Sequence, residues 1–282
     1  MKILLTGADG FTGRAFARLA QTAGHEIAAL GCDLTDAAAV AEQVDAIRPE
    51  AVVHLAAIAF VAHEDATALY AVNVVGTMNL LDALCRLPQR PRRVLVASSA
   101  NVYGNCETSP IAETTPPAPV NHYAASKLAM EHMALTCADR LSLVLARPFN
   151  YTGPGQAGQF LIPKLVDHFV RRAPRIELGN LHVEREYNDV RMVCETYLRL
   201  LVADAAPAIV NVCTGQTHSI RQVLDALTDI TGHTIEVAVN PAFVRANEVH
   251  RLCGDAARLR AATGPLPAYT LSDTLRSMLG AA

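Results

Sequence analysis

Short apolar runs alternate with helix-like segments along the first half of the chain. Five of these runs predict strands, at residues 2–5, 26–30, 51–55, 93–97 and 143–146. The segments between them predict helices, at residues 11–23, 36–47, 66–86 and 123–138. Because the strands are apolar throughout and alternate with helices, the pattern predicts an α/β fold with a doubly wound parallel sheet covered on both faces.

The pattern becomes less regular after Arg147, where prolines and glycines mark a loop-rich transition at 148–158. Beyond this transition, helices are predicted at 193–203 and 219–231, and strands at 209–213 and 234–239. We therefore divide the chain into a first domain at 1–150 and a smaller, mixed α/β C-terminal lobe at 151–282. Within that lobe, the segment at about 187–213 is expected to pack back on the first domain.

A glycine-rich turn, TGADGFTG at residues 6–13, lies between the first predicted strand and the first predicted helix. Gly7, Gly10 and Gly13 lack Cβ atoms, so the chain can turn tightly and its backbone can approach a pyrophosphate closely. The helix that follows offers free N–H groups and a partial positive charge to phosphate oxygens. A glycine triplet alone is a weak signal, but its place between a strand and a helix predicts a dinucleotide-binding Rossmann domain.

The choice of dinucleotide depends on the end of the second strand, where an acid can bind the 2′-hydroxyl of the adenosine ribose. Asp33 follows Gly13 by 20 residues and could take that role, or it could cap the next segment or contact the adenine. The stretch between Arg18 and Arg48 contains no Lys or Arg to bind a 2′-phosphate. These features favour NADH, although Arg14 or a distant arginine would still admit NADPH.

A tyrosine and a lysine four residues apart, Tyr123 and Lys127, lie on the predicted helix at 123–138. Positions i and i+4 share a helix face, so the lysine cation is expected to lower the pKa of the phenol from about 10. The phenol could then exchange a proton near neutral pH while a hydride moves. Upstream, Ser98 and Ser99 follow the predicted strand at 93–97, at the sheet edge where ligands bind in open α/β folds.

Composition narrows the functional class. The 282 residues carry 24 Lys and Arg against 27 Asp and Glu, and this net charge of −3 does not favour nucleic acid or a membrane surface as partner. Seven cysteines without a CxxC pair, and ten histidines without HExxH spacing, argue against a disulfide framework and against a metal site. The apolar runs are too short for a secretory signal or a membrane span, so we expect a cytoplasmic protein. Only three of the basic residues are lysines: Lys2, Lys127 and Lys164.

Six motifs together resemble the extended short-chain dehydrogenases/reductases, which act on nucleotide sugars. They are TGADGFTG at 6–13, HLAA at 54–57, NVVGTMNLL at 73–81, SSANVYG at 98–104, YAASK at 123–127 and RPFNYTGPGQ at 147–156. The resemblance covers essentially the whole chain. Within the family, the segment 31–36, RPFNYTGPGQ, VEREYNDV at 183–190 and VNVCTGQ at 210–216 are most similar to GDP-4-keto-6-deoxy-D-mannose reductases, which form GDP-D-rhamnose or close relatives.

The resemblance implies a role for each matching residue. Ser99 would hold the C4 oxygen of the sugar, Tyr123 would donate the proton, and Lys127 would bind the nicotinamide ribose and tune Tyr123. The implied cofactor contacts are Gly7, Asp9, Gly10, Phe11, Gly13, Asp33, Leu34, Leu55, Ala56, Ala57, Asn73, Tyr123, Lys127 and Arg147. The implied substrate contacts are Ser99, Asn101, Asn150, Arg185, Arg245 and Glu248.

Three of the implied substrate residues are charged. Arg185 would meet the substrate pyrophosphate, a bidentate task that suits a guanidinium. Arg245 and Glu248 match positions that grip the nucleotide ribose, and an ordinary surface charge is the alternative at both.

The residues after Ser99 bear on the type of reaction. The related 4,6-dehydratases carry an acidic pair there, whereas this chain has Ala100 and Asn101, which cannot abstract a proton. We therefore expect NAD(P)H-dependent reduction of the C4 keto group of a nucleotide 4-keto-6-deoxy sugar, GDP-linked by resemblance. The alternatives are a 4-epimerase with tightly bound NAD and a non-catalytic dinucleotide sensor or scaffold. The family also implies a homodimer formed through the apolar helices at 66–86 and 123–138.

Overall fold

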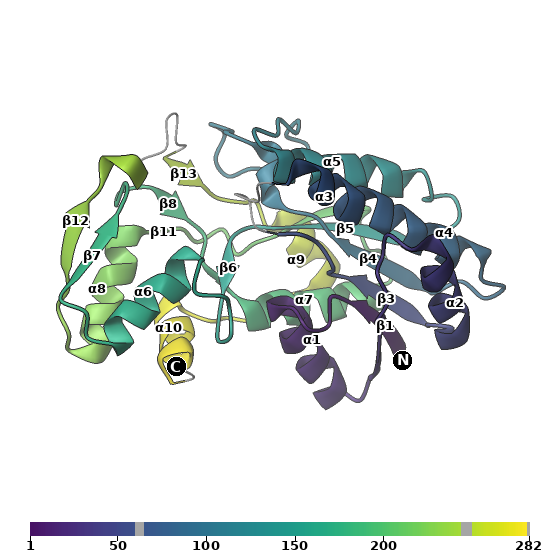
Figure 1. The fold of residues 1–282 in the computed structure, drawn as a ribbon, viewed down its shortest axis with the longest axis horizontal. Coiled ribbons are helices and arrows are strands. Elements are labelled where there is room, and N and C mark those ends of the chain that lie inside the picture. Colours follow the sequence, from purple (N-terminus) through teal and green to yellow (C-terminus); the bar gives the residue numbers. More distant parts are fainter. Residues whose placement is uncertain (60–64, 244–249, 281–282) are drawn as a thin grey trace.

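The computed structural model describes residues 1–59, 65–243 and 250–280. A six-stranded sheet with the order β10-β5-β4-β3-β1-β2 forms the centre of the larger lobe, and all its neighbouring strands are parallel (Figure 1). Its strands are β1 (Lys2–Thr6), β2 (Glu26–Ala29), β3 (Ala51–His54), β4 (Arg93–Ala97), β5 (Leu143–Pro148) and β10 (Ile209–Val212). The doubly wound α/β fold predicted from the sequence is therefore confirmed.

Helices cover both faces of this sheet, as strands that are apolar throughout require. One face packs against α2 (Ala37–Ile47), α4 (Thr77–Arg86) and α5 (His122–Leu135). The other packs against α1 (Phe11–Thr22), α7 (Val190–Val202) and α9 (Ala257–Thr263). Side chains alternate between the two cores along a strand, since Leu4 lies in the first and Ile3 and Leu5 lie in the second.

The predicted helix at 66–86 consists of three parts: α3 (Ala66–Tyr70), the π-helical segment η1 (Ala71–Gly76) and α4. Within the described ranges, it is the one helix long and apolar enough to cross a membrane by length and composition. Half of its most apolar window is nevertheless buried inside the protein, where it packs against α2 and α5. Burial of this kind is typical of a helix that belongs to the core of a domain.

The smaller lobe is built around one parallel pair of strands, β7 (Arg175–Leu178) and β12 (Glu236–Val239). The helices α6 (Leu161–Val170), α8 (Ile220–Thr231) and α10 (Leu271–Leu279) pack with this pair in a separate apolar core. Two-residue strands complete the lobe: β8 (Glu184–Arg185) lies between β11 (His218–Ser219) and β13 (Arg251–Leu252), and β6 (Tyr151–Thr152) pairs with β9 (Asn188–Asp189). Strands of two residues are too short to show a periodic pattern in the sequence, so neither the β11-β8-β13 sheet nor the β6-β9 pair was predicted.

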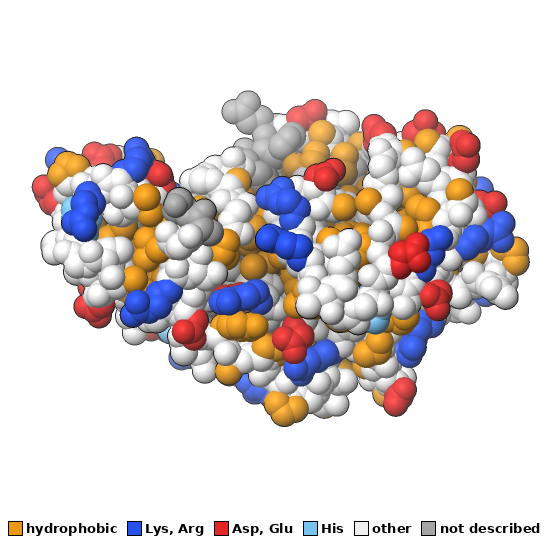
Figure 2. Space-filling model, turned by 90° about the horizontal axis from the view of Figure 1, so that it is seen from below, with side chains coloured by type: hydrophobic (Ala, Val, Ile, Leu, Met, Phe, Trp, Pro, Cys, Tyr) orange, Lys and Arg blue, Asp and Glu red, His pale blue; other side chains and the backbone are white. Residues whose placement is uncertain are grey.

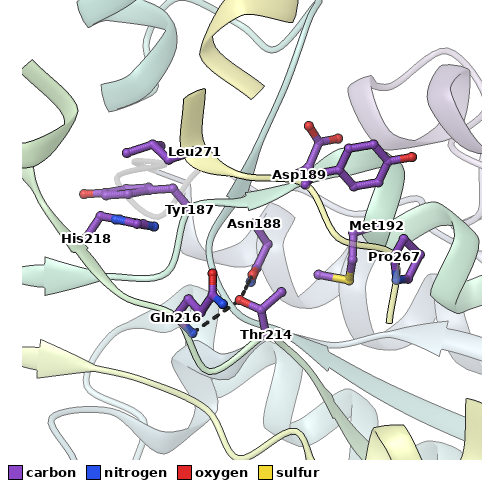
Figure 3. Close-up of a pocket in the computed structure, with 10 residues that line it drawn as sticks. Tyr187, Asn188, Asp189, Met192, Thr214, Gln216, His218, Pro267 and Leu271 are labelled. Carbon is purple, nitrogen blue, oxygen red and sulfur yellow. Dashed lines mark hydrogen bonds between the residues drawn. The ribbon is translucent and has the colours of Figure 1, made fainter. Parts of the chain in front are cut away.

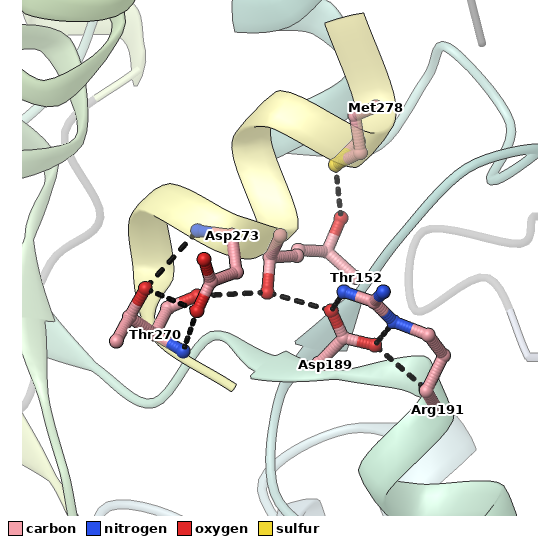
Figure 4. Close-up of polar contacts among 7 residues, drawn as sticks. Thr152, Asp189, Arg191, Thr270, Asp273 and Met278 are labelled. Atoms are coloured by element: carbon pink, nitrogen blue, oxygen red, sulfur yellow. Dashed lines mark hydrogen bonds and ion pairs between the residues drawn. The ribbon is translucent and has the colours of Figure 1, made fainter. Parts of the chain in front are cut away.

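Asp189 fastens the C-terminal helix to α7 (Figure 4). Its carboxylate caps α7 by accepting a hydrogen bond from the Arg191 N–H at 2.8 Å, and it also receives the Arg191 guanidinium at 2.7 Å. The Thr274 hydroxyl of α10 donates to the same carboxylate at 2.8 Å. Because α7 packs on the main sheet and α10 on the smaller core, these bonds tie the two lobes together.

The face seen in Figure 2 carries side chains of both charges, interspersed with apolar ones. The described residues on this face form no continuous basic surface of the kind that binds nucleic acid. This distribution agrees with the small net charge of −3.

Candidate active site

The glycine-rich turn joins β1 to α1 at the carboxyl end of the sheet. Gly7 has a φ of +68°, a backbone conformation that favours glycine, and a Cβ there would lie 2.8 Å from the Ala56 nitrogen. A Cβ on Gly13 would overlap the Gly7 carbonyl oxygen, so α1 packs directly on the turn. Gly10 is the N-cap of α1, and no side chain accepts a hydrogen bond from the N–H groups in the first turn of this helix. These N–H groups are therefore available to an anion.

Asp33 stands beyond the end of β2 and is exposed. Its carboxylate accepts the N–H and the hydroxyl of Thr35, both at 2.8 Å, and these bonds hold the pKa of Asp33 below its usual value. The neighbouring Leu34 is buried against the helical core, with its carbonyl bound by Asn79 at 2.8 Å. Asp33 is therefore a fixed anion near the position where an adenosine ribose is expected.

Ser99, Tyr123 and Lys127 are brought together at the carboxyl ends of the strands. All three are buried, with exposed fractions of 6%, 7% and 4%. The Ser99 hydroxyl lies beside the Tyr123 phenol, and it accepts the side-chain amide of Asn101 at 3.1 Å. Lys127 Nζ donates to the carbonyl of Ala97, the last residue of β4, at 2.8 Å. The constellation thus combines a phenol, a hydroxyl and a cation in one desolvated place.

The start of α5 sets this geometry locally. Asn121 is the N-cap, and its side chain accepts the Ala124 N–H at 2.8 Å, so the helix begins at His122. Tyr123 and Lys127 then fall one turn apart on the same face, as predicted from their spacing.

The expected pKa shift of Tyr123 is wrong in direction. Burial raises the pKa of the phenol above its ordinary value, and only the neighbouring Ser99 hydroxyl works against this rise. Lys127 does not lower it, because its ammonium is turned to the Ala97 carbonyl and is itself desolvated. Burial lowers the pKa of Lys127 to about 8, with Glu131 opposing the decrease. Tyr123 is consequently held as a protonated acid beside a lysine that is still mostly charged at neutral pH.

His54 ends β3 in a buried chain of hydrogen bonds. Thr77 donates its hydroxyl to the Asn73 carbonyl at 2.7 Å, so it must accept the bond from His54 Nε2 at 2.8 Å. His54 Nδ1 is then an acceptor for the Thr6 hydroxyl at 2.7 Å, and Thr6 in turn accepts N–H groups from residues 55–56. Burial lowers the pKa of His54 to about 3, which agrees with this neutral tautomer.

Asn73, whose implied contact with the cofactor stays a prediction, is bound to other parts of the protein. It is fully buried, and its side chain accepts the Ile58 N–H at 2.9 Å and donates to the Ser126 hydroxyl at 3.0 Å. Ser126 donates to the Tyr123 carbonyl at 2.8 Å. Asn73 therefore supports the loop after β3 and the first turn of α5 from inside the protein.

Arg147, a further implied cofactor contact that stays a prediction, is also bound within the protein. Its guanidinium is 3% exposed and forms two hydrogen bonds with Glu131 and one with the Tyr103 hydroxyl. A cation paired in this way is directed into the protein interior.

The implied substrate residues are less completely defined. Asn101 contacts Ser99, and Asn150 is exposed at the end of the segment after β5. Arg185 lies on β8, where its guanidinium donates to the Glu184 carbonyl at 2.8 Å. Arg245 and Glu248 lie outside the described residues. The substrate contacts of this set stay predictions. The cofactor contacts of the exposed Asp9 and the half-buried Ala57 stay predictions as well.

Tyr151 is a site residue that the sequence reasoning did not single out, although it lies within the RPFNYTGPGQ motif. Its ring stacks on Phe11 of the glycine-rich turn, with centroids 6.0 Å apart, and its hydroxyl bonds Thr12 at 2.8 Å. Burial raises the pKa of Tyr151 to about 12. This contact joins the turn to the second lobe, so only the tertiary structure shows it.

A small cavity lies between β9, the segment after β10 and the start of α10 (Figure 3). Asn188, Thr214, Gln216 and His218 point toward it, and the Thr214 hydroxyl donates to Asn188 at 2.7 Å. Its volume of about 20 Å³ suits a single water molecule and is far too small for a sugar nucleotide. No group of three or more His, Cys, Asp or Glu residues in the described part of the chain could hold a metal ion.

Comparisons with known proteins agree with this geometry. The family model described as GDP-mannose 4,6 dehydratase matches residues 8–278. A GDP-6-deoxy-D-talose 4-dehydrogenase from Aggregatibacter actinomycetemcomitans is 36% identical over 265 residues, which cover 92% of this chain and 90% of that protein. A GDP-6-deoxy-D-mannose reductase from Pseudomonas aeruginosa is 38% identical over 242 residues, covering 82% and 79%. The solved structure of RMD from Pseudomonas aeruginosa in complex with NADPH superimposes with a TM-score of 0.90 at 34% identity, covering 99% of this chain and 96% of that one.

Proposed function

This chain belongs to the GDP-mannose 4,6-dehydratase family of extended short-chain dehydrogenases/reductases, and on that premise we propose that it reduces the C4 keto group of a GDP-linked 4-keto-6-deoxy sugar. The observation that carries the proposal is the buried set Ser99, Tyr123 and Lys127 beside the glycine-rich turn. The named relatives are a reductase and a dehydrogenase of GDP-6-deoxy sugars. The reductant is a nicotinamide dinucleotide, the cofactor class of this family.

The residues at the turn fit such a cofactor. A side chain on Gly7 or Gly13 would collide with the neighbouring backbone, so the tight turn that approaches a pyrophosphate needs glycine at both positions. The uncapped N-terminus of α1 suits the pyrophosphate itself. When bound, the reduced dinucleotide supplies the hydride that adds to C4 of the sugar.

Tyr123 supplies the matching proton to the C4 oxygen. Its raised pKa keeps the phenol protonated until an alkoxide, a stronger base, develops beside it. The Ser99 hydroxyl, which lies beside Tyr123, orients the same oxygen, and Lys127 adds a positive charge close to both. The protein therefore contributes an acid, a hydrogen-bond donor and a cation, all held in place before substrate arrives.

The family model is described as a dehydratase, but the residues of this chain favour reduction over dehydration. A 4,6-dehydratase must remove the C5 proton, and the two residues after Ser99 carry no carboxylate. Ala100 is buried, and the Asn101 amide donates to Ser99 at 3.1 Å. Both belong to η2 (Ala100–Tyr103), the 3₁₀ turn that follows Ser99.

The test is to incubate the purified protein with GDP-4-keto-6-deoxymannose and NADH or NADPH, and to follow the loss of reduced cofactor. Consumption of cofactor with formation of a GDP-6-deoxyhexose supports the proposal, and no consumption with either cofactor contradicts it. Protein that arrives with tightly bound NAD and interconverts C4 epimers without added reductant would be an epimerase instead. Comparing NADH with NADPH also tests the preference for NADH that the sequence favours, and whether Asp33 binds the ribose 2′-hydroxyl.

We further propose a homodimer in the cytoplasm, formed through α4 and α5. Val75 at the end of η1, Met78 of α4 and Met133 of α5 are 48%, 38% and 38% exposed. A Met78→Glu/Met133→Glu double variant should sediment as a monomer, whereas Val170→Glu, a control at an equally exposed valine on α6, should not change the mass in solution. A monomeric wild-type protein would contradict the proposal.

A further inference from the structure

A buried ion pair lies directly behind the candidate active site. Glu131 of α5 and Arg147 of β5 are 2% and 3% exposed. Arg147 Nε donates to one carboxylate oxygen at 2.9 Å and Arg147 NH2 to the other at 2.6 Å. Removing two charges from water is costly, and a hydrophobic pair of the same volume is often as stable. The pair therefore calls for an explanation other than stability alone.

The pair fixes the residue before Ser99. The Ser98 hydroxyl donates to Glu131 at 2.5 Å, and the Ser98 N–H donates to the Ala146 carbonyl at 2.7 Å. Glu131 lies on α5, the helix that also carries Tyr123. Through Ser98 the end of β4 is thus attached to the helix of the proton donor.

The pair also fixes the turn after Ser99. Arg147 NH1 donates to the Tyr103 hydroxyl at 3.0 Å, and its guanidinium lies 4.9 Å from the centre of the Tyr103 ring. Tyr103 ends η2, and its hydroxyl donates to Asn211 of β10 at 2.7 Å. Ser99 is consequently held on both sides along the chain by the two halves of one ion pair.

Glu131 acts on Lys127 as well. The two residues are one helical turn apart, and the Glu131 charge favours the protonated lysine. The other groups near Lys127 are Tyr123 on the same helix, the neutral His54 from β3, and the Ala97 carbonyl from β4. Among these groups, Glu131 is the only anion, and Arg147 beyond it is the opposing cation.

We propose that Glu131 and Arg147 form a positioning pair that sets Ser99 in register with Tyr123, and that Glu131 keeps Lys127 in its charged form. The inference rests on the proposed function for its effect on turnover. Its electrostatic part can be measured on the protein without any substrate.

The experiment uses the small number of lysines. Protein labelled with ¹³C at lysine Cε gives three signals, from Lys2, Lys127 and Lys164. The signal that is missing from a Lys127→Arg variant is that of Lys127. Titration of this signal is compared in the wild type, Glu131→Gln and Arg147→Met. Both variants break the same pair, but only the first removes the anion that faces Lys127.

We expect the Lys127 midpoint to decrease by about one pH unit in Glu131→Gln and to stay at or above the wild-type value in Arg147→Met. The alkaline limb of kcat/KM should shift in the same direction. Equal midpoints in all three proteins, or equal decreases in both variants, would overturn the electrostatic part. Because the titration needs no turnover, inactivity of the wild type on the proposed sugar would count against the function and not against this inference.

Ser98→Ala tests the positioning part and leaves both charges in place. We expect kcat to decrease about tenfold or more, with cofactor affinity and the Lys127 midpoint unchanged. An unchanged kcat would overturn the positioning role, and this readout remains if Glu131→Gln fails to fold. Glu195→Gln is the matched control, because it breaks an Arg–Glu pair on α7 that is one-third exposed and should move neither measurement.

Discussion

Replacing Gly13 with alanine tests whether the close packing of α1 on the glycine-rich turn requires a residue without a side chain. A Cβ at this position would overlap the Gly7 carbonyl oxygen and lie 2.8 Å from the Cα and the carbonyl oxygen of Ala8. Ordinary van der Waals contact begins at about 3.4 Å, and all three atoms belong to the backbone, so no side-chain rotation can relieve the overlap. The first turn of α1 must therefore move away from the end of β1.

Two energies of opposite sign decide the outcome for stability. Alanine is favoured over glycine in a helix by about 1 kcal/mol. Overpacking costs about 1–3 kcal/mol, and the upper end applies here because the atoms in contact are backbone. We expect a net loss of about 2 kcal/mol in the free energy of unfolding. The same displacement moves the N–H groups of α1 away from the pyrophosphate, so cofactor affinity should decrease at least about tenfold, or 1.4 kcal/mol.

Urea unfolding followed by circular dichroism measures the first quantity, and calorimetric titration with NADH and NADPH measures the second. Gly158→Ala is the control, since a Cβ there meets no atom within 4 Å and should change stability by less than about 0.5 kcal/mol. A Gly13→Ala protein with wild-type stability and wild-type cofactor affinity would refute the reasoning, because it would show that the turn is neither tight nor in contact with the cofactor.

Four further outcomes are expected. Tyr123→Phe should keep cofactor affinity and lower kcat by about 10²–10⁴-fold, and undiminished turnover would assign the proton to another group. The kcat/KM for the sugar should decline above about pH 8, where Lys127 loses its charge, and a profile that stays flat to about pH 10 would contradict this. Because burial lowers the pKa of His54 to about 3, the unfolded chain binds a proton below about pH 6.5 that the folded protein does not. The free energy of unfolding should therefore fall by about 4 kcal/mol as the pH drops from 6.5 toward 3, and His54→Gln should flatten this dependence in urea unfolding at a series of pH values. Thr274→Ala should cost about 1 kcal/mol in the same assay, by removing one bond between the lobes, and no change would show that the bond contributes nothing.

Local features of the candidate site could be predicted from the chain alone. The spacing of Tyr123 and Lys127 is read through the period of a helix, and Asn121 fixes the start of that helix by a bond to a residue three positions away. The glycines of the turn lie within one loop, and a strand before and a helix after them are enough to expect their geometry.

Features that depend on distant partners could not be predicted in this way. Arg147 was expected at the cofactor, yet Glu131 and Tyr103, from other elements, draw it into the interior. The lysine beside Tyr123 suggested a lowered pKa, but the surrounding helices and strands exclude water, and this desolvation raises the pKa of the phenol.

The sequence by itself therefore determined the fold class, the glycine-rich turn and the order of Ser99, Tyr123 and Lys127, because periodicity and short covalent spacing carry that information. The tertiary structure alone decided which polar groups are buried, which charges meet and in what direction a pKa moves. These properties depend on the exclusion of water and on contacts between segments far apart in the chain, such as the contact of Phe11 with Tyr151 and that of Asp189 with Thr274. Neither has a local signature in the order of residues.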